Sequence, residues 1–155
     1  MKYQKTIAVI FTSMALVASV YAANVHLKGR SGIKITDQGD TLQVCAALAG
    51  LGNCDLLVTI NAEADIETSL VNPAGNIAPG NSVGDLVSGT ITIPSSQIKN
   101  GSVSFCVSTE GVSTPTWQEA GAPNPQWTVN IEDVTFLSGE IIVEQCGQIV
   151  FQQNF

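Results

Sequence analysis

From residue 23 onward, apolar and polar residues alternate with a period of two, the spacing at which side chains of a strand point to opposite faces. Nowhere do apolar residues keep the i, i+3, i+4, i+7 spacing of an amphipathic helix for long. The alternating stretches are rich in Val, Ile, Thr and Phe, which favour pleated surfaces. The pattern predicts strands at 25–28, 32–36, 41–47, 55–61, 64–70, 88–93, 102–109, 126–136, 138–145 and 148–152.

Turn-forming residues separate these stretches, at 37–40, 50–53, 99–102 and 146–147. Asn100-Gly101 is the strongest hairpin signal, because both residue types tolerate positive φ. Short strands at this spacing predict an all-β fold, an antiparallel β-sandwich that is immunoglobulin-like or jelly-roll-like. We expect one such domain over residues 23–155, with no internal repeat.

The first 22 residues are predicted to be a secretory signal peptide. Lys2 and Lys5 precede an apolar stretch at 7–20, and small residues end at Ala22, where we expect cleavage. The apolar stretch is shorter than the roughly 20 residues that span a bilayer, which disfavours a membrane anchor. We therefore expect a secreted or periplasmic protein with no membrane span in the mature chain.

The amino-acid composition restricts the classes of molecule that the protein can bind. The 155 residues are 45% hydrophobic and 12% charged, with 13 acidic and 6 basic residues and a net charge of −7. Removal of the signal peptide leaves only four basic residues and makes the chain more acidic: Lys28, Arg30, Lys34 and Lys99. Such a surface is soluble and repels nucleic acids and anionic membranes, so we expect neither as a partner.

The four cysteines, Cys45, Cys54, Cys106 and Cys146, are predicted to form two disulfides, as an even count in an exported chain indicates. Closely spaced Cys or His pairs for a zinc site are lacking, and His26 is the only partner for a catalytic thiol. Alternation puts both Cys106 and Cys146 on polar faces, where neighbouring strands of one sheet can be bridged. This favours Cys106–Cys146 and, by default, Cys45–Cys54, among three connectivities.

One predicted strand changes phase. Trp127, Val129 and Ile131 share one parity, whereas Val134 and Phe136 share the other. A β-bulge at Glu132-Asp133 would keep both groups on the core. Bulges also occur beside binding sites, but a simple bend is the favoured interpretation.

Two long segments, 71–87 and 110–125, are predicted to be irregular and contain five of the six prolines. Because binding residues concentrate on loops, the candidate ligand contacts are Trp117, Asn76, Asn81 and Asn124. An exposed Trp117 could stack on a sugar or enter a partner's pocket. Alternatively, it plugs the open end of the sandwich.

Three acidic residues, Glu63, Asp65 and Glu67, alternate and so project from one strand face. Their oxygens are weak candidates for a calcium site, since a straight strand cannot wrap an ion as a loop does. A solvated face is the favoured interpretation, and we expect no cofactor.

The sequence contains few of the residues and motifs that known catalytic sites use. The single histidine and the absence of Gly-x-Ser-x-Gly argue against a serine hydrolase, and no phosphate-binding glycine loop occurs. A carboxylate pair that hydrolyses glycans is the residual enzymatic alternative. We expect a non-catalytic binding module that uses the two loops, with glycan or protein as ligand; the alternative is a structural, fimbria-like or matrix subunit.

Five ordered phrases carry a resemblance: 48–53 (LAGLGN), 71–76 (VNPAGN), 123–128 (PNPQWT), 131–136 (IEDVTF) and the ending 150–155 (VFQQNF). They are similar to phrases of a group of small secreted β-proteins, many of them bacterial. The resemblance covers nearly the whole mature chain and implies a secreted β fold without known catalytic residues. Members often carry cysteines at the positions of Leu70 and Ala122, which implies that the two long loops lie side by side. On that basis the four cysteines of this chain are a different set from the pair that joins the two loops in those proteins, and how they pair stays open.

Overall fold

The computed structural model describes residues 24–30 and 32–155, so the predicted signal peptide lies outside the described residues. This part of the chain is all-β apart from one short 3-10 turn, and it contains no helix of the length and hydropathy that crossing a membrane would require. The elements are β1 (His26–Leu27), β2 (Lys34–Asp37), β3 (Leu42–Ala49), β4 (Leu56–Val71), β5 (Ile77–Pro79), β6 (Val83–Ile93), η1 (Ser95–Gln97), β7 (Ser102–Ser108), β8 (Thr128–Gln145) and β9 (Gln148–Asn154).

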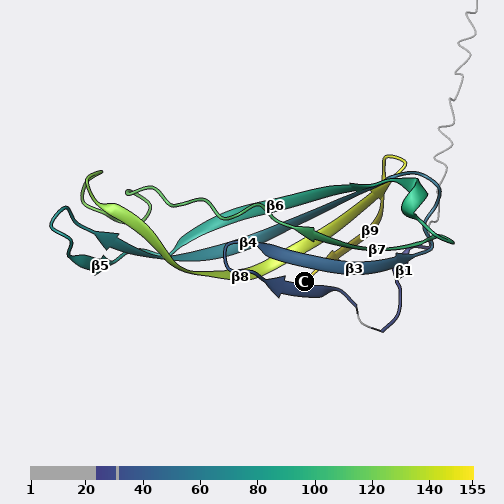
Figure 1. Ribbon diagram of the computed structural model, residues 1–155, viewed down its shortest axis with the longest axis horizontal. Coiled ribbons are helices and arrows are strands. Elements are labelled where there is room, and N and C mark those ends of the chain that lie inside the picture. The colour runs from purple at the N-terminus through teal and green to yellow at the C-terminus, as the bar shows by residue number, and fades with distance from the viewer. Residues whose placement is uncertain (1–23, 31) are drawn as a thin grey trace, which may run out of the picture.

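The strands form two antiparallel sheets that pack as a sandwich (Figure 1). In sheet A, β3 lies in the middle, with β7 on one edge and both β1 and β2 on the other. In sheet B, β4 is paired with β6 and β5 on one edge and with β8 on the other, and β9 follows β8. The predicted all-β antiparallel sandwich is confirmed.

The core lies between the sheets and follows the alternation. Every second residue of β3 is buried, from Leu42 to Leu48, as is every second residue in the first half of β4, from Leu56 to Ala62. Ile141 and Val143 of β8 complete the centre and are fully buried. Burial of each such large aliphatic side chain contributes about 1.5–3 kcal/mol, so the repeated pattern determines which face turns inward.

Two pairs of predicted strands are in fact single long strands. The predicted strands at 55–61 and 64–70 are both parts of β4, and those at 126–136 and 138–145 are both parts of β8. The predicted bulge is confirmed, since Glu132 is the extra residue where the pairing with β4 shifts. A second shift leaves Leu137 unpaired and explains why β8 resembled two strands.

The segment 71–87 is less irregular than predicted. It contains β5 and the first residues of β6, which starts at Val83. The turn before β5 is closed by the Asn72 side chain, which accepts hydrogen bonds from the main-chain N–H groups of Ala74 and Asn76, both at 2.9 Å. This Asx turn makes a hairpin out of a Pro- and Gly-containing stretch.

The predicted disulfide pairing is wrong: the bonds are Cys45–Cys106 and Cys54–Cys146. Cys45 and Cys106 lie directly opposite each other on β3 and β7, with Cα atoms 4.0 Å apart, so the expectation of a bridge within one sheet was right but the partner was not. Cys146 lies outside a strand, in the turn between β8 and β9. There it reaches the segment before β4, because Leu56 pairs with Gln145.

Among the described residues, two bends have consecutive positive φ values, and each is a tight turn. Asn100 and Gly101 have φ values of 51° and 69°, and the flanking Lys99 and Ser102 pair, which confirms the predicted turn. Cys146 and Gly147 adopt 53° and 75° and connect β8 to β9.

Candidate functional site

The second half of β4 and the first half of β8 extend past sheet A, and the segment 110–127 lies beside them at this end (Figure 1). A small apolar cluster forms there, separate from the main core. We call it the tip cluster; it comprises buried Leu70, Ala120 and Ala122, with the partly buried Trp117, Trp127 and Val129 packed against it. Both tryptophans of the chain therefore lie at this tip.

A single helical turn positions Trp117. Glu119 N–H donates to the Thr116 hydroxyl at 3.3 Å, while Thr116 N–H and Oγ1 donate to the Glu119 carboxylate at 2.8 and 2.7 Å, which is a capping box. At its other end, Gly121 has a φ of 79°, and Ala122 N–H donates to Trp117 O at 2.7 Å. This left-handed C-cap returns the chain toward the tip cluster.

The two predicted loops lie against one another. Asn81 N–H donates to Ala120 O at 3.0 Å, and the Asn81 side-chain amide donates to Glu119 O at 3.4 Å. The buried Thr68 of β4 donates its hydroxyl to Asn81 O at 2.7 Å. Leu70 and Ala122, the two positions suggested by the resemblance, belong to the same cluster. The expected juxtaposition of the loops is thus present.

The four candidate contacts have different surroundings. Trp117 is half-buried against the tip cluster, so part of its ring is packed and part is accessible. Asn81 links the two loops, and Asn124 accepts a hydrogen bond from Gln126 N–H at 3.0 Å. Asn76 is exposed in the turn before β5. The structure therefore brings Trp117 and Asn81 onto one unit, whereas Asn76 and Asn124 lie in separate turns.

The acidic row occupies the outward face of β4. Glu63 and Glu67 are exposed and Asp65 is half-buried, as alternation predicts. Within residues 24–30 and 32–155, no three His, Cys, Asp or Glu side chains converge as a metal site requires. Glu63 instead accepts a hydrogen bond from the Ser138 hydroxyl, at 3.3 Å.

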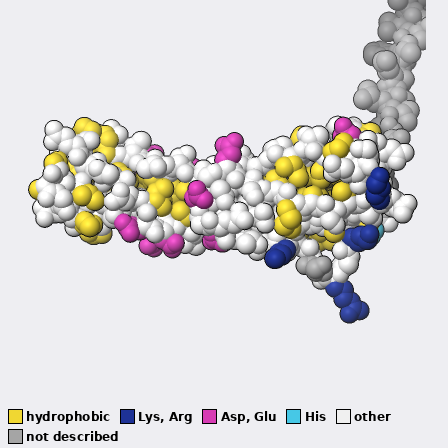
Figure 2. All heavy atoms as spheres, viewed as in Figure 1, with side chains coloured by type: hydrophobic (Ala, Val, Ile, Leu, Met, Phe, Trp, Pro, Cys, Tyr) yellow, Lys and Arg dark blue, Asp and Glu magenta, His cyan; other side chains and the backbone are white. Residues whose placement is uncertain are grey.

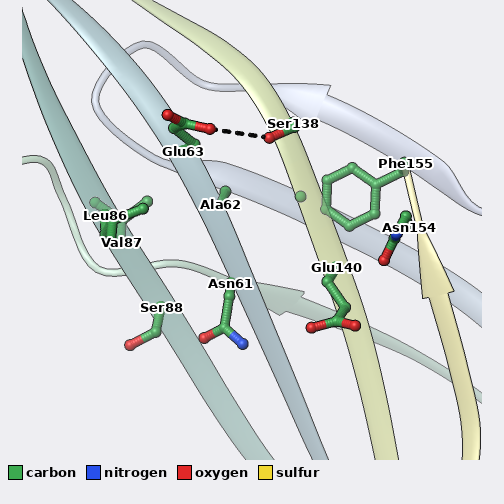
Figure 3. Close-up of a pocket in the computed structure, with 11 residues that line it drawn as sticks. Asn61, Ala62, Glu63, Leu86, Val87, Ser88, Ser138, Glu140, Asn154 and Phe155 are labelled. Carbon is green, nitrogen blue, oxygen red and sulfur yellow. Dashed lines mark hydrogen bonds between the residues drawn. The ribbon is translucent and has the colours of Figure 1, made fainter.

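A groove of about 690 Å³, lined by both polar and apolar groups, crosses the outer face of sheet B beside Glu63 (Figure 3). Its polar side chains come from four strands, and residue spacing could not identify it because those strands meet only in the folded sheet. Two carboxylates, Glu63 and Glu140, line it, and Glu140 also accepts a hydrogen bond from the Gln152 amide. The other polar lining residues are Asn61, Ser88, Ser138 and Asn154.

His26, the only histidine in the sequence, lies on β1 of sheet A, whereas the groove is on sheet B. One of its ring nitrogens is 2.8 Å from Asn24 O. No protein-family model matches the chain, and no curated protein matches it significantly. Function is therefore inferred from the geometry of the chain itself.

Proposed function

We propose that this protein is an exported, non-catalytic binding protein whose tip, formed by the two long loops, recognises a glycan or a protein. The observation that carries the proposal is the position of Trp117, half-buried on the tip cluster next to the two loops, which hydrogen bonds from Asn81 hold together. Tryptophan combines a large apolar surface with an N–H donor, which makes it a frequent anchor in binding sites.

Preorganisation supports this function. The capping box, the C-cap at Gly121 and the bonds from Asn81 hold the Trp117 turn before any ligand arrives. A loop that is already ordered loses less conformational entropy on binding than a mobile one. The tip therefore has the rigidity that loops need to act as a recognition surface.

Export is supported by two independent features. The predicted signal peptide directs the chain out of the cytoplasm. The two disulfides are compatible with the oxidising environment of a periplasm or extracellular space. The proposed site of action is accordingly outside the cytoplasm.

The test is an array of glycans and extracellular proteins screened with the oxidised mature protein and with Trp117→Ala. We expect at least one ligand, whose signal falls by about tenfold or more in Trp117→Ala, the scale of a hot-spot loss. Trp117→Phe should retain an intermediate signal, because it preserves an aromatic surface.

Ile149→Ala is the matched control. Ile149 is 57% exposed near the β8–β9 turn, at the end of sheet B opposite the tip, so its truncation should leave binding unchanged. Binding that persists in a folded Trp117→Ala variant would remove Trp117 from the site. Turnover of a glycan substrate would point to the hydrolase alternative instead.

A further inference from the structure

The two outer faces of the sandwich carry charges of opposite sign. On the outward positions of sheet B lie six acidic residues, and in the described strands of that sheet none of these positions holds Lys or Arg. Basic residues gather at one end of the molecule, whereas acidic residues lie mainly along the rest of it (Figure 2). The outward acidic residues of sheet B are Glu63, Asp65, Glu67, Asp133, Glu140 and Glu144.

The outer face of sheet A is basic and hollowed. Lys28 and Lys99 line a hollow of about 330 Å³, and Lys34 lines a second one of about 480 Å³. The two hollows share Ser104, and their floors are built largely from Ser, Ala and the Cys45–Cys106 disulfide. Small side chains leave room for a projecting partner side chain, and no acidic residue occupies an outward position on the described strands of this sheet.

The groove on sheet B has complementary features. Glu63 and Glu140 face it from neighbouring strands, with the Ser138 hydroxyl beside Glu63 and the Asn61 amide beside Glu140 (Figure 3). Leu86 lines it and is 82% exposed, which is unusual for leucine in the middle of a strand. A lysine ammonium on its flexible stem can reach carboxylates in such a groove, while a leucine can enter a hollow lined by small residues.

We propose that the groove of sheet B binds the basic face of sheet A of a second copy of this chain. Each copy then offers one acidic and one basic face, so the contact is heterologous. A heterologous contact that does not close into a ring produces an open, head-to-tail assembly. The inference does not depend on ligand binding at the tip, because Trp117 and the tip cluster lie on neither of these surfaces.

Salt gives this contact a distinctive signature. Copies with the same negative net charge repel one another at low ionic strength. Near 0.15 M salt the screening length is about 8 Å, which suppresses long-range repulsion but preserves contacts between touching faces. At about 1 M salt the screening length falls to about 3 Å and the contacts themselves weaken. Association should therefore be greatest at intermediate salt.

The experiment measures sedimentation of the oxidised mature protein from about 10 µM to about 1 mM, the regime of weak contacts. Two charge-reversed variants are compared with the wild type, one with Glu63→Lys and Glu140→Lys and the other with Lys28→Glu and Lys34→Glu. We expect the wild type to associate and each variant alone to remain monomeric. Mixed in equal amounts, the two variants should associate again, because each reversed face meets a face of opposite charge.

A third variant, with Asp40→Lys and Glu110→Lys, matches the first in net charge, but these exposed residues line neither the groove nor the two hollows. It should associate like the wild type. A wild type that stays monomeric at every salt concentration overturns the proposal. So does assembly that survives both reversals, or a pair of folded, monomeric variants that fail to recombine. Binding of a neutral oligosaccharide to the groove of the monomer, if Asn61→Ala abolishes it, would show that the groove serves a different ligand and would overturn the proposal.

Discussion

Gly89 of β6 lies against the main chain of Ser108 at the end of β7, with no space between them for a β-carbon. A Cβ built on Gly89 overlaps the main-chain oxygen of Ser108, and Glu110 N–H donates to Ser88 O at 2.8 Å beside it. At this point sheets A and B approach each other along one side of the sandwich. The absence of a side chain at residue 89 permits that approach.

Gly89→Ala is expected to lower the free energy of unfolding by about 1–3 kcal/mol, because main-chain atoms must move apart to admit the methyl group. Chemical denaturation measures the change. Gly84→Ala is the matched control on the same strand, since a Cβ there has no neighbour within 4 Å. It should change stability by no more than about 0.5 kcal/mol. Equal effects of the two substitutions would contradict the proposed close approach.

The disulfide connectivity predicts a peptide map. Digestion without reduction should yield one linked pair that contains Cys45 and Cys106 and another that contains Cys54 and Cys146. Replacement of both cysteines of either bond by serine should cost about 2–5 kcal/mol of stability. A linked peptide that contains Cys106 and Cys146 would refute the strand register between β3 and β7.

Gln145 links the segment before β4 to the end of β8 through its side chain. It is 5% exposed, accepts a hydrogen bond from Gly52 N–H and donates one to Cys54 O, both at 2.8 Å. Gln145→Ala removes both hydrogen bonds and leaves Gly52 N–H and Cys54 O without their partner. We therefore expect the free energy of unfolding, measured by thermal or chemical denaturation, to fall by about 1–3 kcal/mol. Gln148→Ala, at the exposed position just after the β8–β9 turn, should be nearly neutral. Comparable losses in the two variants would argue against a special role for Gln145.

Glu119 provides a pH-dependent contact at the tip. The Thr116 hydroxyl, and next its main-chain N–H, hold the pKa of Glu119 below its ordinary value. A carboxyl whose folded-state pKa is lowered stabilises the fold above its unfolded pKa and loses that contribution as the pH falls through the folded pKa. The Trp117 turn should therefore loosen in acid.

Thr116→Val should raise the pKa of Glu119 toward the ordinary value, as followed by NMR titration of its carboxyl carbon. Thr114→Val, two residues earlier in the same loop, should leave the titration unchanged. An unaltered midpoint in Thr116→Val would mean that the capping box does not form in solution.

The sequence was most informative where alternation is uninterrupted. In β3 every second residue from Leu42 to Leu48 is buried, and the strand was predicted almost to its ends. In β8 the extra residues Glu132 and Leu137 each reverse the parity, and only the first reversal was interpretable as a bulge. At Leu137 and Ser138 the alternation breaks, and a period-two pattern alone cannot show whether such a break is a bulge within one strand or a turn between two.

Local sequence patterns could not predict which distant strands pair or in what register. Cys45 meets Cys106 because β3 and β7 pair in one particular register, and parity alone permits several partners. The groove of sheet B likewise needs four strands to be placed side by side. The Trp117 turn, by contrast, has a local signal that the sequence analysis missed: Thr116, Glu119 and Gly121 have the spacing of a capping box followed by a helix-ending glycine.

The order of the cysteines along the chain affects how the protein acquires its bonds. Each bond connects the first half of the chain to the second, with sequence separations of 61 and 92 residues. During synthesis, Cys45 and Cys54 are made first, and they are a non-native pair separated by a short loop that closes readily. Correct maturation therefore requires oxidation to wait for β7 and β8, or an early mispairing to be undone by thiol–disulfide exchange.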